Sequence, residues 1–185
     1  MQTMTRSGPS GFLYVEGFLT DEEQQSLLHH LATLTFTHDI FRGKPMKRSE
    51  LCQGFRYRAV GRRLEPADPF DEHCLLLTHK ALPYCPDGTP FDQCIIQQYP
   101  EGAGIGWHTD APVFGDVILG VSLGAEGRLQ FRKDRNSSVC FEVAPASGSL
   151  YVMSGPARWG FQHRVVPVRA LRYSLTFRSV QGLDR

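Results

Sequence analysis

The sequence lacks the features that mark several large classes of protein. No run of about 18 apolar residues occurs in its 185 residues, so we expect no membrane span and no membrane partner. Its first eleven residues are polar, unlike a secretory signal. The net charge is only +1, lower than is usual for a protein that binds nucleic acid through charge alone. The sequence has no internal repeats or low-complexity segments. We expect a monomer in the cytoplasm, or in the nucleus of a eukaryote.

The cysteines are few and follow no pairing pattern. There are five, and none has the C-x-x-C spacing of a zinc knuckle or redox motif. An odd count also disfavours a disulfide framework, so reduced thiols are expected. They are Cys52, Cys74, Cys85, Cys94 and Cys140.

Positive charge is concentrated in one stretch. Between Arg42 and Arg63 lie eight basic residues against a single acid, Glu50. Such a stretch fits either a solvated basic surface or a patch that contacts phosphates, and the sequence does not separate the two.

The expected layout is a single domain in three parts. Residues 1–10 are expected to be a flexible tail, residues 11–90 a mainly helical portion, and residues 91–185 a β-rich core. Thr20 and Glu23 form a capping box ahead of one helix, and a second helix is expected near residues 70–82, between Pro69 and Pro83.

The second half of the chain reads as short strands separated by turn residues. Eight strands at this spacing are typical of a jelly roll, so the predicted fold class is α+β with a jelly-roll core on which the N-terminal helices pack. The expected strands span residues 93–99, 105–110, 117–123, 128–132, 139–144, 149–153, 162–166 and 171–180.

His108 and Asp110 form an H-x-D pair on one expected strand. Side chains alternate between the two faces of a strand, so both point the same way. His163, on a later strand, can complete two imidazoles and a carboxylate, the facial set that binds Fe(II) in non-haem oxygenases. His29, His30, His38, His73 and His79 fall in the helical portion and are interpreted as surface or core residues.

The last expected strand has a polar face that needs an explanation. It carries Arg172, Ser174, Thr176 and Arg178. This face is either solvent-exposed or lines a cavity for a dianion, because an arginine offers a planar fork for a carboxylate. The arginines are roughly 20 Å apart along the strand, so they would serve opposite ends of a small dicarboxylate. Gln97 and Tyr99 share a face of an earlier strand and can donate to the same ligand.

Residues 91–178 resemble the AlkB family of nucleic-acid dealkylating dioxygenases in motif order and spacing. The matching segments are residues 96–102, His108-Thr109-Asp110, residues 121–124, residues 153–163, and the closing R-x5-R of Arg172 and Arg178. The last of these is a hallmark of the family.

The resemblance implies a double-stranded β-helix with Fe(II) on His108, Asp110 and His163 as catalytic centre. It assigns the distal carboxylate of 2-oxoglutarate to Arg172 and Tyr99, with Arg178 nearer the metal. Gln97 and Ser174 stand where the family commonly has Asn, and both keep hydrogen-bonding capacity.

The implied activity is oxidative demethylation of alkylated bases in DNA or RNA, with single-stranded nucleic acid as the expected partner. O2 is the second cosubstrate, and the products are succinate, CO2 and formaldehyde. The family's lid corresponds to residues 53–58, where Phe55 and Tyr57 would stack on a flipped base and Arg56 and Arg58 would reach phosphates. An edge strand with buried aromatics explains the same residues equally well.

Three alternatives stay open. The chain could be an AlkB-like oxygenase of a protein side chain or small molecule, because Ala111-Pro112-Val113-Phe114 lacks the second acid that some repair enzymes carry. It could be a degenerate binding module. A cupin-like zinc enzyme is the third, although the paired arginines would have no role there.

Overall fold

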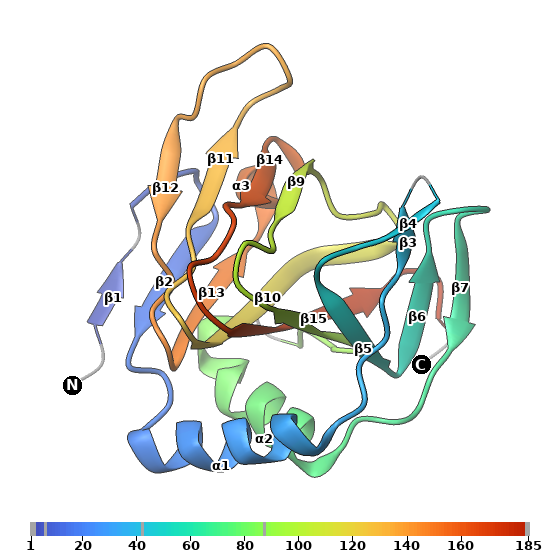
Figure 1. Cartoon of the computed structure of the whole chain (residues 1–185). Coiled ribbons are helices and arrows are strands. Elements are labelled where there is room, and N and C mark those ends of the chain that lie inside the picture. The colour runs from blue at the N-terminus through green and yellow to red at the C-terminus, as the bar shows by residue number, and fades with distance from the viewer. Residues whose placement is uncertain (1–2, 6, 42, 87, 184–185) are drawn as a thin grey trace.

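The computed structural model describes residues 3–5, 7–41, 43–86 and 88–183, and its two main sheets have α1 and α2 on one side (Figure 1). The helices are α1 (Asp21–Thr33), α2 (Glu72–Ala81), the 3-10 turn η1 (Leu82–Tyr84) and α3 (Gly155–Trp159).

The large sheet has seven strands in the order β1-β2-β13-β10-β15-β8-β5, and every named pair is antiparallel. Its strands are β1 (Thr3–Thr5), β2 (Phe12–Glu16), β5 (Ser49–Gln53), β8 (Gln93–Tyr99), β10 (Phe114–Gly124), β13 (Ser149–Met153) and β15 (Arg172–Val180).

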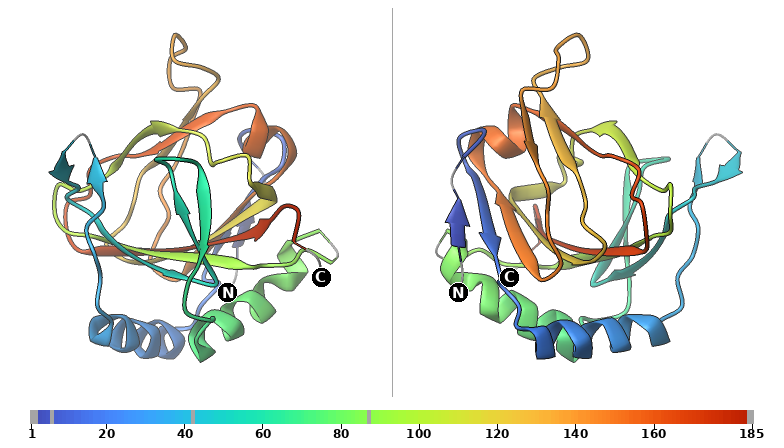
Figure 2. Two further views of the ribbon diagram at one scale, coloured as in Figure 1. Left: turned by 90° about the vertical axis from the view of Figure 1, so that its right-hand side faces the viewer. Right: turned by 60° about the vertical axis from the view of Figure 1, so that its left-hand side comes forward.

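The small sheet has four strands in the order β12-β11-β14-β9. They are β9 (Ile105–His108), β11 (Leu129–Arg132), β12 (Phe141–Val143) and β14 (Gln162–Val165). There are two further antiparallel pairs: β3 (Ile40–Phe41) with β4 (Lys44–Pro45), and β6 (Phe55–Arg58) with β7 (Arg63–Pro66). The β3–β4 pair projects from the body of the molecule (Figure 2).

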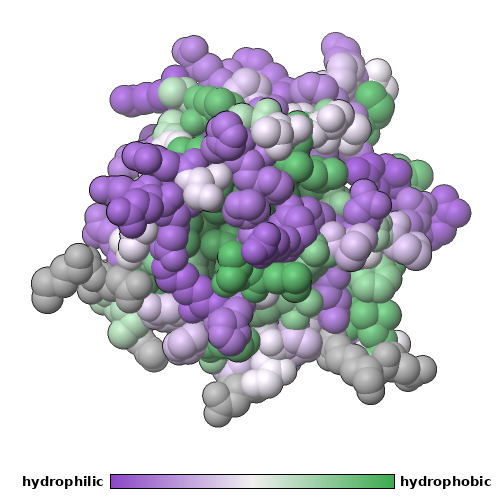
Figure 3. Space-filling model, turned by 90° about the horizontal axis from the view of Figure 1, so that it is seen from below, coloured by the Kyte–Doolittle hydropathy of each residue, from purple (hydrophilic) through white to green (hydrophobic). Residues whose placement is uncertain are grey.

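Helices α1 and α2 cover the face of the large sheet that points away from the small one, whereas α3 lies beside β14 (Figure 1). The predicted capping box begins α1, since Thr20 Oγ1 accepts from the Glu23 backbone N–H and the Glu23 carboxylate accepts from the Thr20 N–H. Leu27 and Leu31 of α1 and Leu77 of α2 are buried in the core beneath the sheet. Seen from this side, the molecule is mostly hydrophilic with hydrophobic residues showing between (Figure 3).

The structure shows which way the polar face of β15 points, toward solvent or toward the interior. Tyr173, Leu175 and Phe177 pack into the core between the large sheet and helices α1 and α2. The polar side chains of the strand face the other way, toward the small sheet, and Arg172 and Ser174 are nevertheless buried. The polar face therefore lines the interior between the two sheets and is not a solvent-exposed surface.

The expected strands are present, two of them with the predicted bounds, at residues 93–99 and 149–153. The N-terminal portion differs from the expectation of a mainly helical segment, because it also supplies β2 and β5 to the large sheet. Thr3–Thr5, expected in a flexible tail, pair with β2 as β1. Among the described residues, no helix is both long enough and apolar enough to cross a membrane.

Candidate functional site

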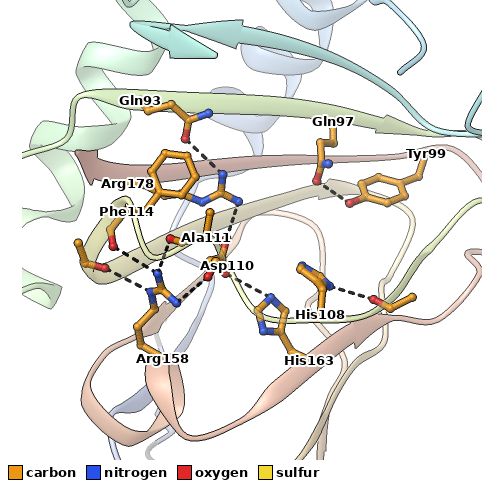
Figure 4. A network of polar contacts seen from close by, with 12 residues as sticks. Gln93, Gln97, Tyr99, His108, Asp110, Ala111, Phe114, Arg158, His163 and Arg178 are labelled. Carbon is orange, nitrogen blue, oxygen red and sulfur yellow. Dashed lines mark hydrogen bonds and ion pairs between the residues drawn. The ribbon is translucent and has the colours of Figure 1, made fainter. Parts of the chain in front are cut away.

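The three residues predicted to bind iron converge between the sheets (Figure 4). His108 on β9 and His163 on β14 are direct cross-strand partners, and their ring centroids are 4.3 Å apart. Asp110 follows β9, and its Oδ2 lies 3.4 Å from His163 Nε2. The β9–β14 register therefore brings His108 and His163 together, and Asp110 joins them from just beyond the end of β9, where the strand was expected to continue.

Both imidazoles are neutral at pH 7. Burial lowers the pKa of His108, and burial together with the neighbouring His108 lowers the pKa of His163 to about 3. The contact between His163 and Asp110 is therefore not an ion pair at neutral pH. His108 Nδ1 donates to the Gly106 carbonyl at 2.9 Å, so the lone pair is on Nε2, where a metal can take it.

Asp110 stays ionised although it is buried. Burial raises the pKa of this carboxyl, but the lowering by Arg178, His163 and His108 is larger. The pKa of Asp110 therefore lies well below its usual range. Arg178 Nη2 donates to Asp110 Oδ1 at 2.7 Å, while Arg178 Nη1 donates to Gln93 at 3.3 Å. Arg178 thus orients the carboxylate and balances its charge.

Arg158 holds the backbone that follows Asp110. It lies on α3, is only 2% exposed, and makes four hydrogen bonds to carbonyl oxygens (Figure 4). Those oxygens belong to Asp110, Ala111, Phe114 and Gly115. One buried guanidinium therefore fixes the turn that carries Asp110.

The other end of the interior holds the residues predicted to bind 2-oxoglutarate. On neighbouring strands, Arg172 pairs with Tyr99 and Ser174 with Gln97. The Tyr99 hydroxyl donates to Gln97 Oε1 at 2.7 Å, and the Arg172 guanidinium lies 5.3 Å from the centre of the Tyr99 ring. Burial raises the pKa of Tyr99 to about 12, so its phenol keeps the proton that it donates.

Unpaired buried atoms show where these residues fit a metal and a dianion. Asp110 Oδ2 is buried without a hydrogen-bond partner among the described residues, and so is Arg172 Nη1. Leaving such atoms without a partner is costly, and a metal or carboxylate would remove that cost. A Cβ on Gly127 would come within 2.7 Å of Arg172 Nε, so the glycine leaves room for this guanidinium.

The predicted lid residues lie beside this site on the hairpin β6–β7. Phe55 and Tyr57 are half-buried against the hydrophobic cluster that contains Phe114, and the rings of Tyr57 and Phe114 are 5.8 Å apart. Arg178 lies over the same Phe114 ring, at 4.6 Å. Arg58 is ion-paired with Glu65 at 3.1 Å and with Asp39 at 3.7 Å, so its charge is already balanced within the protein.

Sequence reasoning missed Arg158 and Glu50. The carbonyl oxygens around Arg158 leave no sequence signal beyond a basic residue in a matching segment.

Glu50 shares a face of β5 with Cys52. It pairs with Gln97 on β8 and is 7% exposed. Burial and Asp39 raise its pKa, against the effect of Arg48, Arg56 and Arg178. A buried acid thus borders the site, although none follows the H-x-D.

Comparisons with known proteins identify the family to which the chain belongs. Residues 11–178 match the sequence profile of the 2OG-Fe(II) oxygenase superfamily. The tRNA (carboxymethyluridine(34)-5-O)-methyltransferase alkbh8 of Xenopus tropicalis is 28% identical over 90% of this chain, which spans only 27% of that protein. The alpha-ketoglutarate-dependent dioxygenase AlkB of Escherichia coli is 30% identical over 68% of this chain and 63% of its own length.

Two solved structures share the fold. The structure of OsALKBH1 matches with a TM-score of 0.71 at 18% identity and covers 96% of this chain and 100% of that one. A 2OG-Fe(II) oxygenase family oxidoreductase from Burkholderia pseudomallei matches at 0.65 and 20% identity, covering 91% and 84%. The chain belongs to the 2OG-Fe(II) oxygenase superfamily, as a dioxygenase of the AlkB type that uses Fe(II) and 2-oxoglutarate.

Proposed function

We propose that this dioxygenase oxidatively demethylates alkylated bases of DNA or RNA. Its iron ligands would be His108, Asp110 and His163. The residues that hold 2-oxoglutarate would be Gln97, Tyr99, Arg172, Ser174 and Arg178. Phe55, Tyr57 and Arg58 would contact the substrate.

The observation that carries the oxygenase chemistry is the set of two neutral imidazoles and one buried carboxylate beside two inward-facing arginines. Neutral histidines and an ionised aspartate are the protonation states that bind a divalent metal. Fe(II), 2-oxoglutarate and O2 supply the oxidising power for hydroxylating an inert C–H bond, with succinate and CO2 as products.

The chain's own residues have three tasks in this reaction. Arg178 keeps Asp110 ionised and oriented, and Arg158 fixes the turn behind it. Arg172, with Tyr99 beside it, offers an unpaired donor to the distal carboxylate of the cosubstrate. The β6–β7 hairpin packs against Phe114, whose ring also contacts Arg178, and so borders the site.

Support for a nucleic-acid substrate comes from the hairpin and from the relatives. Half-buried Phe55 and Tyr57 next to the site are suited to stack on a base taken out of a strand. The Xenopus relative is named for a modification of tRNA. Because this chain spans a quarter or so of that protein, the methyltransferase activity in its name is not carried over.

One observation favours a second candidate, an AlkB-like oxygenase of a protein side chain or small molecule. Arg58, expected to reach a phosphate, is held by Glu65 and Asp39. A phosphate contact there would have to displace two carboxylates, whereas a substrate without phosphate requires no such change.

The experiment is anaerobic reconstitution with Fe(II) and 2-oxoglutarate, followed by O2 and a methylated single-stranded oligonucleotide. Succinate and formaldehyde are measured together. Demethylation of the base predicts that both products appear in equal amounts. Succinate without formaldehyde would keep the dioxygenase and reject this substrate in favour of the second candidate.

The control for this experiment is His108→Ala, which should abolish iron-dependent turnover while the chain still unfolds cooperatively. Turnover that persists in this variant would contradict the assignment of His108 as an iron ligand. Binding of the unmethylated oligonucleotide at two salt concentrations separates the candidates further, because contacts to phosphates weaken as salt rises.

A further inference from the structure

A second cluster of metal-ligand residues lies on the helical side of the molecule, away from the space between the sheets. His30 is in the last turn of α1, and Asp71 and His73 are at the start of α2. One ligand atom from each of the three lies within 4.8 Å of the others. All three side chains are half-buried where the two helices meet beneath the large sheet (Figure 1).

Asp71 is held in place by the chain itself. Its Oδ1 accepts from the Cys74 backbone N–H at 2.8 Å, and its Oδ2 accepts from Gln53 Nε2 at 2.8 Å. The Asp71 N–H donates back to Gln53 Oε1 at 3.1 Å. These bonds lower the pKa of Asp71 against the effect of burial, so the carboxylate is ionised and oriented. Support of this kind is what metal-binding carboxylates receive from the residues around them.

A hydrogen bond explains only part of the cluster. His30 Nε2 lies 2.9 Å from Asp71 Oδ2, which accounts for these two residues as a simple helix-to-helix contact. His73 is left over. Its ring stacks on that of His30, with centroids 4.1 Å apart and planes 10° from parallel. Neither ring nitrogen of His73 has a hydrogen-bond partner within the described ranges.

The donor set indicates the kind of ion. Two imidazoles and one carboxylate are ligands of Zn²⁺ and of neighbouring transition metals, with a fourth position free for water at a half-exposed site. Bonds of about 2.0 to 2.1 Å to a tetrahedral ion place ligand atoms about 3.4 Å apart. Rotation of the His73 ring can supply the remaining closure from 4.8 Å.

We propose that His30, Asp71 and His73 bind a divalent transition metal of the zinc type, at a site separate from the iron centre. The ion would join the end of α1 to the start of α2. Between these two points runs the segment with β3 to β7, which includes the β6–β7 hairpin. The metal would therefore hold together the two ends of the β3–β7 segment, which borders the active site.

The test is a zinc titration of the full chain, freed of metal with a chelator and followed by calorimetry. Because the iron centre can also bind zinc, the expected result is two zinc ions per chain. His73→Gln should bind one, and His108→Ala should bind one by loss of the other site. The double variant, which combines His73→Gln and His108→Ala, should bind no zinc at the same concentrations.

His29 and His79 provide matched controls, because they are exposed histidines on the same two helices outside the cluster. His29→Gln and His79→Gln should still bind two zinc ions. Zinc should also raise the melting temperature of His108→Ala, in which only the second site remains, and not that of the double variant.

The proposal is overturned if His73→Gln keeps the wild-type stoichiometry and affinity, or if the second zinc binds only at millimolar concentration. Loss of folding does not confuse this result, since His73 makes no hydrogen bond within the described residues and its replacement should leave the metal-free melting temperature unchanged. None of these measurements uses turnover, so failure of the proposed demethylation and failure of this site are distinguishable.

Discussion

Arg172 and Arg178 lie on the same strand and on the same inward face, yet their surroundings are opposite in kind. Arg178 has a carboxylate partner inside the protein, Asp110, at 2.7 Å. Arg172 has only the Ser122 hydroxyl, at 3.1 Å, and its Nη1 is buried without a partner within the described ranges. The first arginine completes a site, whereas the second still has a donor to offer to an anion. Two arginines on the same face of one strand therefore have different roles.

The largest effect is expected from removing the charge of Arg178. In Arg178→Met, the pKa of Asp110 should rise because burial is then opposed only by weaker neighbours. A protonated aspartate cannot bind metal, so iron affinity should fall, by about 10- to 100-fold, and fall further as the pH is lowered. Anaerobic Fe(II) titration at two pH values measures this.

Arg178→Lys is the matched control for that variant, since it keeps the charge and loses the planar fork. It should recover much of the iron affinity and its flat pH profile. Unchanged iron binding in Arg178→Met would remove the contrast between the two arginines.

Arg172→Met should act on the cosubstrate and leave the metal alone. Loss of a charged hydrogen bond to the distal carboxylate should raise the KM for 2-oxoglutarate by about 10- to 100-fold. Turnover at saturating 2-oxoglutarate and iron affinity should stay near wild type. Steady-state kinetics with varied 2-oxoglutarate give both values, and a fall in iron affinity would contradict the assignment.

The metal triad should make the metal-free protein less stable in acid. The pKa of His163 is 6.5 in the unfolded chain and about 3 in the folded one, so between these values the unfolded state binds the extra proton. The free energy of unfolding should therefore decrease as pH falls through this window, by about 1.4 kcal/mol per pH unit for one full proton. Urea unfolding at several pH values measures the slope.

His163→Gln should flatten this slope, and Arg172→Met should not change it. The lowered pKa of His108 adds to the loss in the same direction below 6.5, and that of Asp110 adds to it below 3.8. An identical slope in His163→Gln would show that another group titrates.

The smallest effect is expected from Gly127→Ala. Its new Cβ would lie 2.7 Å from Arg172 Nε and 3.1 Å from Cζ, so the guanidinium must move. Because the end of an arginine side chain can shift, we expect a several-fold rise in the KM for 2-oxoglutarate with iron affinity unchanged. A KM equal to that of the wild type would indicate that the position of Arg172 is not set by this contact.

Local rules predicted much of the fold and of the site. Alternation along a strand placed Arg172, Ser174 and Arg178 on one face, which the structure shows to be interior. The H-x-D spacing brought Asp110 to His108, although the strand ends at His108. The family resemblance supplied the assignment of Arg172 and Tyr99 to one carboxylate, which is not yet tested.

Features that depend on distant pairing could not be predicted in this way. β2 pairs with β13 and β5 pairs with β8, both far along the chain. Local patterns around these two segments therefore did not indicate that they belong to the large sheet. His30 and Asp71 are 41 residues apart and share no periodic pattern. The same holds for Arg158, whose partners are backbone carbonyls and therefore carry no side-chain signal.

β9, the strand that carries His108, is the last strand of the small sheet, and within the described residues it pairs only with β14, across an irregular register. Edge strands open at a smaller free-energy cost than the body of a sheet, and amide hydrogen exchange reports such opening. The two histidines can therefore separate by local fraying while the seven-stranded sheet stays closed. Iron would then slow exchange in β9 and β14 far more than in β8 or β15, which gives a residue-level measure of metal loading without any substrate.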